Sequence, residues 1–359
     1  MPVRTVLTTA SMPHPRDVLL GAQGTAGALP VCDHYSGVEN RMKKSLQLQA
    51  EMTQEFGTCV FDVTLDCEDG APVGGEVEQA HRVVALANEA RSRSAASGLA
   101  QRVGARLHPV GHAAFSSDVQ IVVAGAAAAL SYLMIPKVES VADVDCALAQ
   151  IDAAAVSTLD TPIPLHVLIE SPAAVRAVFD IAAHPRVESV SFGLMDFVSA
   201  HGGAIPSTAM TVRSAHDTLT LDQFHHPLVV RAKAEISSAC HAFGKVPSHC
   251  VVTEFRDTLA LESAARKAAT ALGFTRMWSI HPDQIRPIVK AFAPSEQEVE
   301  QAASIVLEAM RQAWAPISVR GTLHDRASYR YFWQVLERAQ RTGCRLPVEV
   351  QAVLGVPSH

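Results

Sequence analysis

Short apolar runs recur along the chain and alternate with longer segments of helical periodicity. The runs have the length of buried strands and lie at residues 29–32, 59–66, 102–107, 132–138, 164–170, 190–196, 249–253 and 276–280. The segments between them place apolar residues three and four positions apart, which is typical of amphipathic helices. Near-continuous apolar strands are typical of parallel sheets. Eight strand–helix units in succession therefore predict an α/β fold, a closed (β/α)₈ TIM barrel, and disfavour an open doubly wound sheet.

Both ends of the chain depart from this alternation. Residues 1–28 are rich in Gly, Thr and Pro and have no sustained period, so we expect an irregular N-terminal arm before a barrel domain at residues 29–294. Residues 295–359 show only helical patterns, beginning with a capping box and including an aromatic-rich stretch. We expect this C-terminal helical segment to pack at a subunit interface. The polar stretch 203–225 after the sixth run predicts an insertion or a lid.

Composition narrows the class of protein. The chain has 359 residues, 48% of them hydrophobic, which is enough for a full core. A net charge of −6 with scattered Lys and Arg argues against nucleic-acid binding. The seven cysteines form no CxxC pair and are typical of a reducing compartment. With no recognisable secretory signal and no uninterrupted apolar span, we expect a cytoplasmic protein without membrane segments.

Two of the predicted strands end in a carboxylate. Glu170 precedes Ser171 and Pro172, which are typical of a helix start, and Gly193 permits a tight turn before Asp196. Each acid alone is more typical of a helix cap or a solvated loop. At the C-terminal edge of a barrel, however, the two would lie where ligands bind. Two carboxylates without Cys or paired His favour a hard cation, Mg²⁺ first, with Mn²⁺ or Ca²⁺ as alternatives.

Charged residues follow most of the other predicted strands. They are Asp66, Glu68, Asp69, Arg106, His108, Lys137, Glu139, Glu254 and His281. Buried carboxylates close together raise each other's pKa unless a cation compensates them. A planar guanidinium among them suits a substrate carboxylate or a developing enolate oxygen. Arg106 is therefore the candidate for that role.

Six short motifs occur in the order that one known family has them. They are LDCEDGAP at 65–72, RLHP at 106–109, IPKVE at 135–139, LIES at 168–171, FGLMD at 192–196, and SIHPDQI at 279–285 followed by FAPS at 292–295. They resemble DLEDAVP, RxNP, PKVE, IET, FGxxD and IHPxQI…FxPS of the citrate lyase β-subunit-like family, also called the HpcH/HpaI aldolase/citrate lyase family. The chain is identified as a divergent member of it.

The resemblance implies a barrel of the phosphoenolpyruvate/pyruvate type and a Mg²⁺-dependent carbon–carbon lyase. Its substrate would be a 3-hydroxy-dicarboxylyl-CoA, such as malyl-CoA or citramalyl-CoA, split into a 2-oxo acid and an acyl-CoA, or formed by the reverse condensation. The implied roles are metal binding for Glu170 and Asp196, oxyanion stabilisation for Arg106, ordering of metal-bound water for Asp66, Glu68 and Asp69, substrate binding for Gly193, Lys137 and Glu139, and CoA binding for His281, Pro282 and Gln284.

The resemblance also implies a contribution from a neighbouring subunit. The stretch 321–325 matches a pattern of the family that ends in an acid, here Asp325. That residue would act as the general base, from the C-terminal segment of an adjacent copy. A homo-oligomer, a trimer or a hexamer, is therefore expected.

The sequence departs from the family at several positions. Residues 30–37 replace the usual LFVPG strand, His108 stands in place of Asn, and Ser171 in place of Thr. Two other functions therefore stay open. One is a metal-dependent aldolase that uses free 2-oxo acids without CoA. The other is a non-catalytic or carrier-dependent subunit of an acyl-carrier lyase complex.

Overall fold

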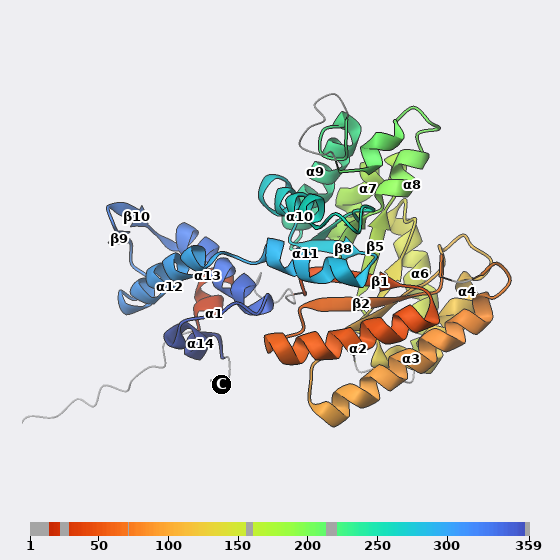
Figure 1. Cartoon of the computed structure of the whole chain (residues 1–359), viewed down its shortest axis with the longest axis horizontal. Coiled ribbons are helices and arrows are strands. Elements are labelled where there is room, and N and C mark those ends of the chain that lie inside the picture. The colour runs from red at the N-terminus through yellow and green to blue at the C-terminus, as the bar shows by residue number, and fades with distance from the viewer. Residues whose placement is uncertain (1–13, 22–28, 71, 156–160, 213–220, 356–359) are drawn as a thin grey trace, which may run out of the picture. The chain divides into compact units, whose positions relative to one another are not determined.

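The computed structural model describes residues 14–21, 29–70, 72–155, 161–212 and 221–355 (Figure 1). The chain divides into two compact units. The larger contains Ala28–Ala293 and Arg341–Gly343, and the smaller contains Met1–Gly27, Pro294–Gln340 and Cys344–His359. Among the described helices, none is both long enough and apolar enough to cross a bilayer.

The larger unit is a closed barrel of parallel strands. They are β1 (Cys32–Ser36), β2 (Phe61–Asp66), β3 (Val103–Arg106), β4 (Tyr132–Ile135), β5 (Leu165–Ile169), β6 (Val187–Phe192), β7 (Val246–His249) and β8 (Arg276–Ser279). Each pairs with its neighbour in chain order, and β1 also pairs with β8, which closes the ring. The predicted (β/α)₈ barrel is confirmed.

Helices between the strands cover the outside of the barrel (Figure 1). The longer ones are α2 (Glu39–Phe56), α3 (Glu76–Ser97), α6 (Val141–Ala155), α7 (Pro172–Ala183), α9 (Pro227–Ala242), α10 (Thr258–Leu272) and α11 (Ile285–Phe292). After β3 the chain instead forms short pieces: α4 (Phe115–Asp118), the π-helical turn η2 (Val119–Val123), α5 (Ala124–Ala126) and the 3₁₀ turn η3 (Ala127–Ala129). Further short helices are α8 (Leu194–Ser199), η4 (Ser207–Met210) and η5 (Pro282–Gln284).

Alternate residues of each strand serve two different environments. On β4, Leu133 and Ile135 belong to the large apolar cluster that includes the covering helices. Tyr132 and Met134 belong to a separate, smaller cluster. Since successive side chains of a strand point to opposite faces, Tyr132 and Met134 point into the barrel. The barrel is therefore filled by side chains and its C-terminal edge is left for ligands.

Two predicted strands are shifted relative to those observed. β1 begins at Cys32, where the predicted run 29–32 ends, and β7 ends at His249, where the run 249–253 begins. Pro30 has no N–H for a ladder, and Cys250 and Val252 are buried although they lie past the last pair with β8. Apolar content marks burial, whereas a strand is defined by pairing.

The smaller unit has its own apolar core. It contains α1 (Pro15–Leu20), α12 (Glu296–Arg311), β9 (Ile317–Val319), β10 (Thr322–His324), α13 (Arg326–Arg341) and α14 (Val348–Leu354). Leu19 of α1 and Trp333 of α13 are both buried in it. The expected capping box is present, since Ser295 and Glu298 exchange hydrogen bonds.

The predictions for the C-terminal segment, the N-terminal arm and the insertion differ from the structure or fall partly on residues that it does not describe. Residues 295–359 are not helical only, because β9 and β10 form an antiparallel hairpin. Arg320 and Gly321 between them both have positive φ, as a tight two-residue hairpin turn requires. The arm at 1–28 includes the helix α1, and its residues 1–13 and 22–28 are outside the described residues, as are 213–220 of the proposed insertion.

Candidate active site

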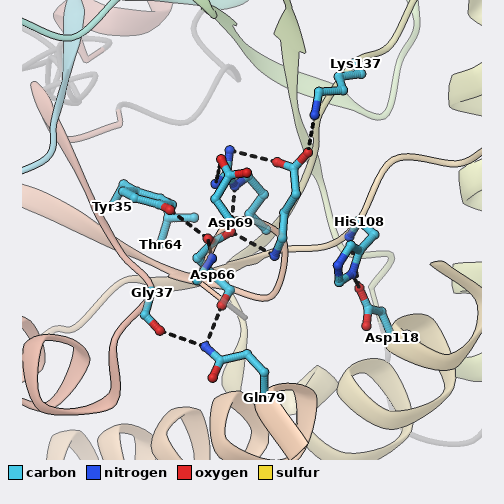
Figure 2. A network of polar contacts seen from close by, with 12 residues as sticks. Tyr35, Gly37, Thr64, Asp66, Asp69, Gln79, His108, Asp118 and Lys137 are labelled. Atoms are coloured by element: carbon cyan, nitrogen blue, oxygen red, sulfur yellow. Dashed lines mark hydrogen bonds and ion pairs between the residues drawn. The ribbon is translucent and has the colours of Figure 1, made fainter. Parts of the chain in front are cut away.

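The C-terminal end of β2 carries a buried carboxylate that several donors hold in place. Asp66 accepts hydrogen bonds from Arg106 Nε at 2.6 Å, from the Tyr35 hydroxyl at 2.7 Å and from the Gly70 backbone N–H at 2.6 Å (Figure 2). These donors come from β1, from β3 and from the loop after β2. Asp66 therefore joins three neighbouring strand ends.

Arg106 lies at the centre of a carboxylate cluster. Its guanidinium also pairs with Glu68 and Asp69, each at 2.9 Å, and lies 4.6 Å above the ring of Tyr35. Burial alone would lower the pKa of Arg106, but the carboxylates around it raise that pKa well above its ordinary value. Arg106 is thus a permanent, fixed positive charge at the mouth of the barrel.

Lys137 connects this cluster to the next strands. Its ammonium group pairs with Glu68 at 2.7 Å, while its backbone N–H donates to Glu170 Oε2 at 2.7 Å. Lys137 has a φ of 53°, a left-handed backbone conformation that is unusual for any residue other than glycine. The strained backbone is what aims the N–H at the carboxylate, which is typical of a functional site.

Glu170 follows β5 and is 6% exposed. Burial and, after it, the charge of Asp196 raise its pKa, the Lys137 N–H opposes the shift, and the net result is a pKa of about 7. Asp196 lies in the first turn of α8, after β6. Both acids line a pocket of about 300 Å³, together with Lys137, Glu139 and Ser199. We name it the carboxylate pocket.

The carboxylate pocket fits a hard cation. A buried carboxylate beside a second acid is electrostatically unfavourable, and a cation between them would relieve it. Within the described part of the chain, no group of three or more His, Cys, Asp or Glu has metal-binding geometry. A cation here would rely on two protein carboxylates and keep other positions for water or substrate, as Mg²⁺ does.

Gly193 is required by the position of Glu170. A Cβ at this residue would overlap the carboxylate oxygen and the Cγ of Glu170. Its φ of −87° is accessible to any residue, so the requirement is steric. Gly193 therefore makes room for Glu170, and its expected role in substrate binding stays a prediction.

We predict that Gly193→Ala displaces Glu170 and lowers metal-dependent activity by about 100-fold, as a roughly 1 Å misplacement of a catalytic group does. Gly111→Ala is the matched control, because its Cβ meets nothing within 4 Å and its φ is not positive. Turnover and Mg²⁺ titration of both variants check this. Equal activity in Gly193→Ala and the wild type would mean that Glu170 is not placed by this contact.

A second pocket lies between the ends of β1 and β8. It measures about 400 Å³, and we name it the loop pocket; its lining includes Tyr35, Gly37, Val38, Arg41, Lys44, Ile280, His281 and Pro282. Two of the three residues expected to bind CoA thus face one cavity. The third, Gln284, is buried and hydrogen-bonded to the backbone of Ile280 and Val252, so it shapes the turn under the pocket.

Asp325 belongs to the smaller unit. It directly precedes α13, where its carboxylate accepts hydrogen bonds from the N–H groups of Ala327 at 3.0 Å and Ser328 at 3.3 Å. This is the geometry of a helix N-cap. The expected role as a general base stays a prediction.

Several residues of the site carried little signal in the sequence. His34 and Tyr35 lie within β1, and burial lowers the pKa of His34 to about 4, which keeps it neutral. Arg41 and Lys44 lie three positions apart on α2 and line the loop pocket, although charged residues in an amphipathic helix are usually a solvated face. Their spacing after the Gly37 turn is the only signal that could have found them.

The chain is similar to a known family and to named lyases. A family model described as HpcH/HpaI aldolase/citrate lyase matches residues 46–282. L-malyl-CoA/β-methylmalyl-CoA lyase of Cereibacter sphaeroides is 32% identical over 223 residues, covering 59% of this chain and 68% of the relative. Malyl-CoA/β-methylmalyl-CoA/citramalyl-CoA lyase of Chloroflexus aurantiacus is 26% identical, covering 66% and 70%.

Solved structures extend the likeness over most of the chain. A citrate lyase from Burkholderia xenovorans is 46% identical, with a TM-score of 0.78, and covers 95% of this chain and 99% of its own. CitE from Mycobacterium tuberculosis, solved with magnesium, acetoacetate and coenzyme A, is 21% identical with a TM-score of 0.61, covering 87% and 98%. The latter likeness shows the fold.

Proposed function

The chain belongs to the HpcH/HpaI aldolase/citrate lyase family, and from that premise we propose that it is a Mg²⁺-dependent lyase of 3-hydroxy-dicarboxylyl-CoA thioesters. The products would be a 2-oxo acid and an acyl-CoA, and the reverse condensation would use the same groups. Malyl-CoA and citramalyl-CoA are the substrates to test first, since the relatives named above are lyases of these compounds.

The observation that carries the proposal is the buried Glu170 beside Asp196 in the carboxylate pocket. The chemistry of this pair suits Mg²⁺, with Mn²⁺ as the alternative, and the bound cation would supply positive charge for the carboxylate and keto oxygens of a 2-oxo acid. Lys137 and Glu139 also line this pocket and would contact the bound acid.

Arg106 is the proposed hydrogen-bond donor to the enolate oxygen; because Asp66, Glu68 and Asp69 outnumber its single charge, the net positive field there would come from the bound cation. In cleavage, the substrate hydroxyl gives its proton to a base, and the breaking carbon–carbon bond leaves its electron pair on the thioester as an enolate, which then takes up a proton. Asp66, Glu68 and Asp69 hold the guanidinium rigidly, so no reorganisation is needed as charge develops. These acids act through Arg106 and through ordered water.

The loop pocket is the proposed site of the CoA portion. Arg41 and Lys44 supply positive charge for phosphates, and His281 stacks on Phe255 at 4.7 Å beside it. Asp69 and Asp283 also line the pocket, so the argument depends on Arg41 and Lys44 themselves: a CoA-independent aldolase would have no phosphates for them to bind. Cleavage of a CoA thioester to an acyl-CoA and a 2-oxo acid therefore separates the two functions.

The experiment incubates the purified full chain and Mg²⁺ with malyl-CoA or citramalyl-CoA. We expect acetyl-CoA as the acyl-CoA product, identified by mass spectrometry, and an equal amount of 2-oxo acid detected as its hydrazone. Turnover of free 2-oxo acids with aldehydes, and none with either thioester, would favour the CoA-independent aldolase. An inert chain that turns over substrate only with added carrier subunits would favour the carrier-dependent reading.

We further propose that Asp325 is the general base and acts from a neighbouring copy in a homo-oligomer. Asp325→Asn and Glu170→Gln are each expected to be inactive. After subunit exchange, a mixture of the two should regain part of the activity, because some sites then combine one intact residue of each kind. Exchange without recovery, verified by native mass spectrometry, would place the base within the same chain or elsewhere.

A further inference from the structure

One buried amide joins two loops of the active site. Gln79, in the first turn of α3, is 2% exposed. Its Nε2 donates to the backbone oxygens of Gly37 and Asp66, both at 2.8 Å (Figure 2). Gly37 follows β1 and Asp66 ends β2. A single side chain thus ties the exits of two adjacent strands together.

The two loops also touch directly. A Cβ on Gly37 would overlap the Cα of Gly70, and a Cβ on Gly70 would overlap that of Gly37. Contact this close is open only to glycine on both sides. Because the Gly70 N–H also donates to Asp66, any movement between the loops would disturb the carboxylate that holds Arg106.

Each loop serves a different half of the proposed reaction. The turn after β1 forms one wall of the loop pocket through Gly37, Val38 and Arg41. The end of β2 carries Asp66, which fixes Arg106. We propose that Gln79 is a positioning residue that fixes the turn after β1 relative to the end of β2. The kinetic part of this inference rests on the proposed function, and its structural part does not.

The barrel offers a matched control in Gln49 of α2. This residue is also fully buried, and its Nε2 also donates to two backbone oxygens at 2.8 Å, those of Phe61 and Arg102. Phe61 begins β2, so Gln49 makes the same kind of bridge at the opposite end of the strand. The two glutamines differ in which end of the barrel they hold.

The test compares Gln79→Met with Gln49→Met in the full chain. Both variants keep the side-chain length and remove an amide donor from two buried backbone oxygens. In Gln49→Met, Arg102 O keeps the N–H of Val63 and Phe61 O keeps the thiol of Cys59, so we expect both variants to lower the melting temperature, Gln49→Met by no more than Gln79→Met. Only Gln79→Met is expected to lose kcat/KM, by about 10- to 100-fold, with the fall shared between kcat and the KM of the thioester. Gln49→Met should stay within about twofold of the wild type.

Hydrogen exchange gives a readout that needs no substrate. In Gln79→Met, amides 66–70 should exchange at least about tenfold faster, and in Gln49→Met the increase should fall on residues 60–63 instead. Local exchange as expected with no turnover in the wild type would leave the positioning role intact and remove the proposed function. Equal kinetic losses in the two variants, or unchanged exchange at 66–70 in Gln79→Met, would overturn the role of Gln79.

Discussion

Replacing Arg106 by Met is expected to lower both stability and turnover more than most single changes in this chain. The guanidinium is 5% exposed and pairs with Asp66, Glu68 and Asp69, of which Asp66 is fully buried. Leaving a buried carboxylate without its partner costs about 3–5 kcal/mol. Loss of the fixed positive charge should lower kcat by about 10²–10³-fold. Urea unfolding and turnover with malyl-CoA measure the two effects.

Two further variants separate charge from geometry. Arg106→Lys keeps the charge but cannot meet three carboxylates with one compact ammonium group, so it should regain part of the stability and little of the activity. Arg102→Met removes an ion pair to the buried Asp62 at the opposite end of β2 and serves as the control. A fall in kcat for Arg102→Met as large as for Arg106→Met would mean that the effect is general destabilisation.

The barrel could be predicted because its signals are repeated. Eight apolar runs separated by segments of helical periodicity allow few other architectures. Small errors in the ends of each run do not change the number of strand–helix units. The shifts at β1 and β7 arose where burial extends past the paired backbone. The β9–β10 hairpin was missed because its strands have three residues each, too short for any period to show.

The site was predictable only where a side chain follows a strand directly. Asp66, Arg106, Glu170 and their neighbours meet at one edge because parallel strands all end there. Gln79 could not be found in this way, since a glutamine in a helix has no distinguishing pattern and its partners are backbone oxygens 13 and 42 residues away. Asp325 lies in a separate unit, where only a motif pointed to it.

Glu170→Gln should abolish metal-dependent turnover and yet stabilise the metal-free protein above neutral pH. In the folded chain burial and Asp196 raise the pKa of Glu170 to about 7, whereas the unfolded chain loses this proton near the ordinary value of 4.5. Between these values the unfolded state binds fewer protons, so stability falls as pH rises and then levels off, by about 3 kcal/mol in total. Glutamine stays neutral and avoids this fall.

The measurement is urea unfolding of wild type and Glu170→Gln in EDTA across this pH range, repeated with Mg²⁺. The free energies of unfolding of the two proteins should differ by a constant amount below the ordinary pKa of 4.5. The difference should change as pH rises to about 7 and stay constant above it. Mg²⁺ should then raise the stability of the wild type only, with a larger effect at higher pH, because it binds the ionised carboxylate. Turnover of the variant should fall by about a thousandfold or more.

Asp196→Asn removes the charge that helps to raise the Glu170 pKa and leaves Glu170 itself unchanged. In this variant the pKa of Glu170 in the folded chain should lie closer to its ordinary value. The free energy of unfolding of the metal-free protein should therefore fall over a narrower pH range than in the wild type. It should also lose the response to Mg²⁺, since one carboxylate of the pair is gone.

A Mg²⁺ response that survives in both variants would place the cation outside the carboxylate pocket. A Glu170→Gln protein less stable than the wild type near pH 8 in EDTA would mean that Glu170 is already ionised and compensated by the chain's own donors.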